Sequence, residues 1–88
     1  MSDAWRVELT RAAERDLRRL DQQVRRRVIA ALDGLSTQPP RGDISRLAGI
    51  EQEWRLRVGD WRVRFTRDQA THTVYVLRVL PRGRAYRD

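Results

Sequence analysis

The sequence predicts an α+β fold, in which an N-terminal strand and a two-helix hairpin precede an antiparallel β-sheet (β-α-α-β-β-β). Apolar and polar residues alternate over residues 4–9 and again over residues 54–65, as they do in half-buried strands. Between them, residues 11–35 repeat apolar positions at helical spacing. A chain of 88 residues can build one modest core, so we expect residues 1–88 to form a single domain.

The N-terminal half supplies the first strand and both helices. Thr10 follows the strand at residues 4–9 and is a typical N-cap residue, which predicts a short helix over residues 11–20. Asp21 can cap a second helix, and the short connection predicts that the two helices form an antiparallel hairpin. The apolar stripe of the second helix consists of Val24, Val28, Ala31, Leu32 and Leu35.

Residues 54–65 carry the strongest strand signal, because two alternating runs flank the turn dipeptide Gly59-Asp60. A two-residue turn there fixes the pairing of a β-hairpin with one apolar face and one basic face. Like charges directly opposite each other destabilise a sheet, so the basic face is expected to bind an anion. The apolar face consists of Trp54, Leu56, Val58, Trp61, Val63 and Phe65, and the basic face pairs Arg57 with Arg62 and Arg55 with Arg64.

A further strand is expected over residues 74–80, after an extended piece around Leu47 and a turn at residues 68–71. Continued alternation predicts that Arg78 lies on the basic face near Arg62. The basic tail, residues 81–88, can fold back onto the same face. The apolar residues assigned to the core side are Tyr75, Leu77 and Val79, and the tail contributes Arg82, Arg84 and Tyr86.

The charge of the chain points to a polyanionic partner. The net charge is +7 and all 19 basic residues are arginine, which suits nucleic acid, an acidic protein or an anionic membrane. A GC-rich genome would explain the absence of lysine but not the placement of the arginines. Alternating arginine is also typical of a sheet face that is simply solvated. Here two facing strands and a basic tail favour an anion site instead, since arginine donates paired hydrogen bonds to phosphate. The helix arginines are expected to lie on solvated sides.

The chain lacks the residues that several functional classes of protein need. The chain has no cysteine for a disulfide or thiolate site, no apolar run of the length that a membrane helix needs, and no signal peptide, so we expect a cytoplasmic protein without membrane contact. It also has no glycine-rich phosphate loop and no Cys/His set, so neither a cofactor nor a metal is expected. His72, the single histidine, is interpreted as an exposed turn residue, and Trp5 as a core residue.

The order of these motifs resembles the RelE/ParE superfamily of bacterial toxins over nearly the whole chain. The resemblance lies in Leu47-Ala48-Gly49, in the hairpin WRLRVGDWRVRF, and in Arg82 followed by Tyr86. The RelE branch implies a ribosome-dependent endoribonuclease that cuts mRNA in the ribosomal A site. In that chemistry the neighbouring ribose 2′-hydroxyl attacks the scissile phosphate, basic residues stabilise the charge on the phosphate, and no metal takes part.

The resemblance also implies roles for individual residues. Known family members often have lysine at the positions of Arg55 and Arg57, and many have histidine at the position of Pro81. Arginine is a poor general base because its pKa lies far above neutral, so we expect the arginines to bind the phosphate and Tyr86 to take the nearest role to acid or base. The implied catalytic residues are Arg55, Arg57, Arg62, Arg82 and Tyr86, and the implied RNA-binding residues are Arg64, Arg78 and Arg84.

Two alternatives stay open at the level of sequence. The ParE branch shares the fold but inhibits DNA gyrase without a nuclease site, and it need not keep the Arg/Tyr set, so Tyr86 favours the nuclease branch. The other alternative is a non-catalytic nucleic-acid-binding module.

The resemblance implies two partners, mRNA on the ribosome and a cognate antitoxin. The antitoxin would form a hetero-oligomer with the toxin, either placing acidic residues on the basic face or wrapping the helices.

Overall fold

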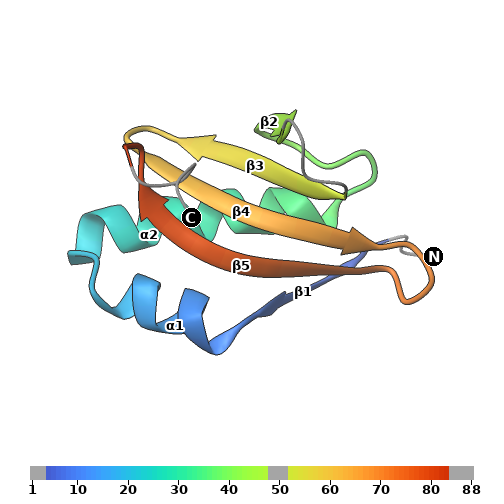
Figure 1. Ribbon diagram of the computed structural model, residues 1–88, viewed down its shortest axis with the longest axis horizontal. Coiled ribbons are helices and arrows are strands. Elements are labelled where there is room, and N and C mark those ends of the chain that lie inside the picture. The colour runs from blue at the N-terminus through green and yellow to red at the C-terminus, as the bar shows by residue number, and fades with distance from the viewer. Residues whose placement is uncertain (1–3, 48–51, 84–88) are drawn as a thin grey trace.

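A five-stranded sheet of order β1-β5-β4-β3-β2 forms the centre of the computed structural model, which describes residues 4–47 and 52–83. β1 pairs with β5 in parallel and every other pair is antiparallel. α2 crosses the back of the sheet, and α1 follows the edge of β5 (Figure 1). The elements are β1 (Arg6–Leu9), α1 (Arg11–Arg18), α2 (Gln22–Asp33), the 3-10 turn η1 (Gly34–Ser36), β2 (Asp43–Arg46), β3 (Glu53–Val58), β4 (Trp61–Asp68) and β5 (Thr73–Pro81).

The predicted fold class is confirmed, with one more strand than expected after the helices. The extended piece expected around Leu47 is the short edge strand β2, which lies a few residues earlier and pairs with β3. The core lies between the helices and the sheet. Its most deeply buried side chains come from both layers and include Phe65, Leu35, Leu56, Val28, Val63, Val74, Val76 and Val79.

Both predicted helix starts are confirmed. The Thr10 hydroxyl accepts a hydrogen bond from Ala13 N at 3.1 Å, and Asp21 Oδ1 accepts one from Val24 N at 3.0 Å. α1 ends at Arg18, two residues earlier than predicted, because the backbone tightens there and Leu20 N donates to Leu17 O. The short turn leads directly into the cap of α2.

The register of the β3–β4 hairpin matches the prediction at every pair. Arg55 lies opposite Arg64 and Arg57 opposite Arg62, with Gly59 at φ +58° in the turn. Glycine adopts that left-handed backbone without the cost that a side chain adds, which suits the sharp reversal. Leu56, Val63 and Phe65 of the apolar face are buried, while Trp54, Val58 and Trp61 pack against the core from partly buried positions.

The predicted faces of β5 are wrong in part, because the strand contains a β-bulge. Arg78 pairs with Arg64 and Val76 with Phe65, so Leu77 is one extra residue on β5. Val79 faces the core as predicted, but Val74 and Val76 replace Tyr75 and Leu77 there. Tyr75 therefore lies on the basic face, and Arg78 lies opposite Arg64 rather than beside Arg62, whose partner is Leu80.

Candidate functional site

The arginine face is the side of the sheet turned away from α2, and its side chains form three rows across the strands. We name these the turn row, the middle row and the far row. The turn row consists of Arg57 and Arg62 with Arg82 just after β5, the middle row of Arg55, Arg64 and Arg78, and the far row of Glu53, Thr66 and Tyr75.

Arg62 is the most buried cation of the turn row. Its side chain is only 8% exposed, and its Nη1 donates to Gly59 O at 2.8 Å and to Trp61 O at 3.0 Å. Arg82 N donates to Asp60 O at 2.9 Å, so the end of β5 is tied to the same turn. Arg57 is exposed and lies 4.0 Å from Asp43, a contact that contributes little stability at the surface.

The electrostatics of Arg62 show which predicted residues come together. Burial lowers the pKa of Arg62, and repulsion from Arg57, Arg55 and Arg82 lowers it further, while Asp60 acts in the opposite direction. The pKa of an arginine is so high that the guanidinium nevertheless stays charged at neutral pH. Three of the other predicted catalytic residues thus lie close enough to Arg62 to repel its charge, and a bound anion would relieve that repulsion.

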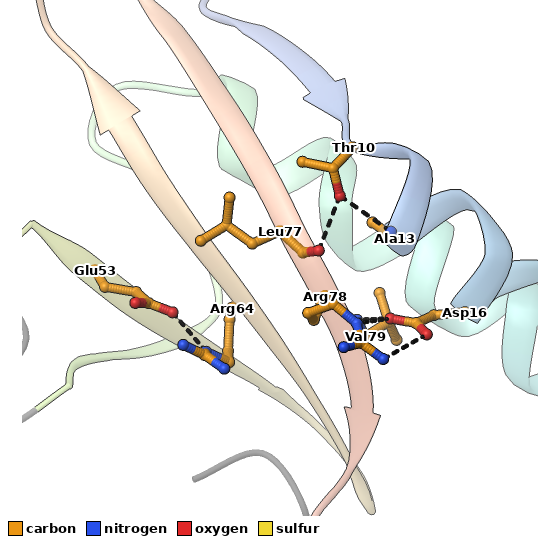
Figure 2. A network of polar contacts seen from close by, with 8 residues as sticks. All are labelled: Thr10, Ala13, Asp16, Glu53, Arg64, Leu77, Arg78 and Val79. Atoms are coloured by element: carbon orange, nitrogen blue, oxygen red, sulfur yellow. Dashed lines mark hydrogen bonds and ion pairs between the residues drawn. The ribbon is translucent and has the colours of Figure 1, made fainter. Parts of the chain in front are cut away.

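The middle row differs because two of its arginines have buried carboxylate partners. Arg64 Nε donates to Glu53 Oε2, and the Arg78 guanidinium donates to both oxygens of Asp16 at 2.8 and 3.1 Å (Figure 2). Arg55 Nη2 donates to Ser45 Oγ at 2.9 Å. Positive charge is therefore compensated in the middle row and accumulates in the turn row.

Sequence reasoning missed both carboxylates. Asp16 lies within the apolar stripe of α1, between Ala13 and Leu20, and an acidic residue at such a position signals a buried partner. Glu53 begins β3 and gives no comparable local signal. Its contact with Arg64 runs diagonally across the hairpin, because the register places Glu53 opposite Thr66.

Arg84 and Tyr86 lie outside the described residues.

Two aromatic contacts lie at the end of the sheet away from the turn row. His72 is exposed, as predicted, and stacks on Trp5 with ring centroids 5.0 Å apart. Arg67 covers the Trp5 ring at 4.3 Å. These residues close the core beside the β4–β5 turn and take no part in the turn row.

One helix arginine is not on a solvated side. The Arg25 guanidinium donates to Leu17 O, Arg18 O and Leu20 O, and so supplies donors to the C-terminal end of α1. The expectation of a purely solvated charge is wrong for this residue.

Neither a membrane helix nor a metal cluster occurs in the described ranges. No helix there is long and apolar enough to cross a membrane. Residues 4–47 and 52–83 also contain no group of three or more His, Cys, Asp or Glu side chains arranged to hold a metal ion.

A protein family and several solved structures match this chain. Residues 7–86 match the family described as ParE toxin of type II toxin-antitoxin system, parDE. A chain of the archaeal RelE-RelB complex from Pyrococcus horikoshii is 30% identical, with a TM-score of 0.78 over 93% of this chain and 99% of that one. A chain of the toxin-antitoxin complex RelBE2 from Mycobacterium tuberculosis is also 30% identical, with a TM-score of 0.77 over 90% and 99% of the two chains.

A more distant match shows the same fold at lower identity. A mutant of the E. coli toxin RelE in the free state is 20% identical, with a TM-score of 0.73 over 89% of this chain and 83% of that one. No curated protein sequence matches the chain.

Proposed function

The chain belongs to the ParE toxin family of type II toxin-antitoxin systems, within the RelE/ParE superfamily, and we propose that it inhibits translation as a ribosome-dependent mRNA endoribonuclease. The observation that carries this proposal is the turn row, where Arg62 is held by backbone carbonyls and repelled by Arg55, Arg57 and Arg82. A preorganised cluster of mutually close guanidinium groups suits a phosphate that gains charge in the transition state.

In the proposed reaction the ribose 2′-hydroxyl attacks the adjacent phosphorus. A 2′-oxygen–phosphorus bond forms, the bond to the 5′-oxygen of the next nucleotide breaks, and the proton passes from the 2′-hydroxyl to the leaving 5′-oxygen. Arg62 would bind a nonbridging oxygen, and Arg57 and Arg82 would share the negative charge. Tyr86 would take part in the proton transfer, because an arginine cannot give up its proton near neutral pH.

The decisive experiment adds the protein to translating ribosomes and maps the new 5′ ends of the mRNA. We expect cleavage by the wild type and a large loss in Tyr86→Phe, with an unchanged circular dichroism spectrum. Cleavage by Tyr86→Phe at the wild-type rate would reject the role of Tyr86. No cleavage by the wild type would reject the nuclease.

The family match gives one specific reason to test a second function. Because the matching family is that of the ParE toxin, inhibition of DNA gyrase is the alternative. A gyrase supercoiling assay separates the two, since a nuclease leaves supercoiling unchanged and a gyrase inhibitor leaves mRNA intact.

An acidic antitoxin is the expected protein partner. The similar chains from P. horikoshii and M. tuberculosis come from toxin-antitoxin complexes. We expect the cognate antitoxin of this chain to place carboxylates against the turn row. Charge reversal in Arg57→Glu and Arg62→Glu should then weaken the complex, and added salt should weaken the wild-type complex. A complex insensitive to both would argue against direct neutralisation of this row.

A further inference from the structure

The far row of the arginine face presents an aromatic ring that the reaction scheme does not use. Tyr75 is 38% exposed and, with Ile29 at 45%, is one of two large hydrophobic side chains exposed among the described residues. Its neighbours Val74 and Val76 are fully buried on the core side, so Tyr75 points the other way. It lies opposite Thr66, whose row also contains Glu53.

The charges around Tyr75 are compensated. Glu53 is hydrogen-bonded to Arg64 in the next row. On the other side of Tyr75, its β1 neighbour Glu8 pairs with Arg6 at 3.0 Å. The arginine face is therefore polarised, with an excess of positive charge in the turn row and a nearly neutral aromatic surface in the far row. Phosphate suits the first surface and an uncharged base suits the second.

The spacing of the rows fits one strand of RNA. Side chains on one face of a strand repeat every ~6.8 Å, so the far row lies roughly 14 Å from the turn row. Arg55 of the middle row lies between them and can contact the phosphates in between. Sheets that bind single-stranded RNA stack unpaired bases on exposed aromatic side chains in this way.

From this arrangement we infer that Tyr75 forms a base-stacking subsite for single-stranded RNA, a few nucleotides from the phosphate bound in the turn row. The inference rests on the proposed function, because it takes RNA as the substrate. Stacking needs the ring and not the hydroxyl, so Phe should replace Tyr75 whereas Leu should not.

The first test uses short single-stranded RNAs that carry 2-aminopurine at successive positions, at low salt. We expect wild type and Tyr75→Phe to change the fluorescence at one position, Tyr75→Leu to lose that change with about 10-fold weaker binding, and Ile29→Ala to behave as wild type. Ile29 is the matched control, since it is equally exposed but lies on α2. No fluorescence change with the wild type, or the same change in Tyr75→Leu, would overturn the subsite.

The second test separates this inference from the proposed function. On translating ribosomes, Tyr75→Leu should raise KM about 10-fold with little change in kcat, because a remote base contact contributes to binding and not to the chemical step. Equal KM values for Tyr75→Leu and wild type would overturn the subsite and leave the nuclease standing. If the wild type does not cleave, the nuclease fails, and the 2-aminopurine result alone decides the subsite.

Discussion

Asp16 of α1 and Arg78 of β5 form an ion pair through two hydrogen bonds, although 62 residues separate them in the sequence. The same Asp16 carboxylate accepts a hydrogen bond from Val79 N at 2.8 Å. β1 ends at Leu9, so the outer edge of β5 beyond that point has no strand beside it. Figure 2 shows α1 in that place, with Asp16 and Thr10 bonded to the exposed edge of β5. The carboxylate thus provides the missing acceptor at the unpaired edge of β5 and neutralises the charge of Arg78.

Replacing Asp16 with Ala should therefore destabilise the fold. Val79 N would lose its acceptor in a buried position, and Arg78 would lose its partner. Because the Arg78 side chain is 41% exposed and can return to water, we expect a loss of about 2–3 kcal/mol, below the cost of breaking a fully buried pair. Urea denaturation measures the loss. Glu14→Ala, at an exposed position of α1, should change stability by less than about 0.5 kcal/mol; equal losses would refute the role of Asp16.

Adjacent arginines of α2 should differ in their contribution to stability. Arg25 donates to three carbonyls at the end of α1, whereas Arg26 is exposed. Arg25→Ala should cost about 1–2 kcal/mol, since charged donors at a helix C-terminus satisfy carbonyls and complement the dipole. Arg26→Ala, which removes the same charge, is the control in thermal unfolding. A similar Tm for both variants would contradict the capping role.

Removing Arg62 should affect activity far more than removing a helix arginine. Loss of one oriented cation at a reacting oxyanion typically costs about 100-fold or more in kcat. We expect that loss in Arg62→Ala on translating ribosomes, and no loss in Arg11→Ala, which removes the same charge from the start of α1. A wild-type rate for Arg62→Ala would exclude the turn row from the reaction.

Glu53→Gln should strengthen RNA binding while it weakens the fold. The substitution keeps the shape of the side chain but leaves Arg64 without its carboxylate, which adds one uncompensated charge to the arginine face. The salt dependence of RNA binding should steepen by about one unit of log K against log salt. Asp33→Asn makes the same change in net charge at the end of α2. If both variants bind RNA alike, net charge and not the middle row controls affinity.

RNA binding should be independent of pH between about pH 6 and about pH 9, because arginines stay charged throughout. The pKa of Arg62 is lower in the folded protein than in the unfolded chain, so its repulsion costs stability wherever it is protonated. That cost disappears only at strongly alkaline pH and is constant across this range. Affinities measured at constant ionic strength test the point; a fall towards pH 9 would show that another group holds the anion.

The sequence predicted the hairpin well because its two-residue turn leaves one register that buries the apolar residues. Arg57 and Arg62 therefore paired as expected. The faces of β5 were not predictable in the same way, since the bulge at Leu77 leaves no mark in an apolar run. The partner of Arg78 was missed for a related reason. A buried ion pair such as Asp16–Arg78 depends on where α1 meets β5, which local periodicity does not encode.

The bulge at Leu77 leaves the two faces of β5 the same on either side of it. A regularly alternating strand from Val74 to Val79 would need one residue fewer, and the chain without Leu77 would still bury Val76 and Val79 and still present Tyr75. The carbonyl of Leu77 accepts a hydrogen bond from the hydroxyl of Thr10 at 2.9 Å. The N-cap residue of α1 therefore satisfies the backbone of the extra residue. Leu77 thus adds one residue to β5 while the strand keeps the same two faces on either side of it.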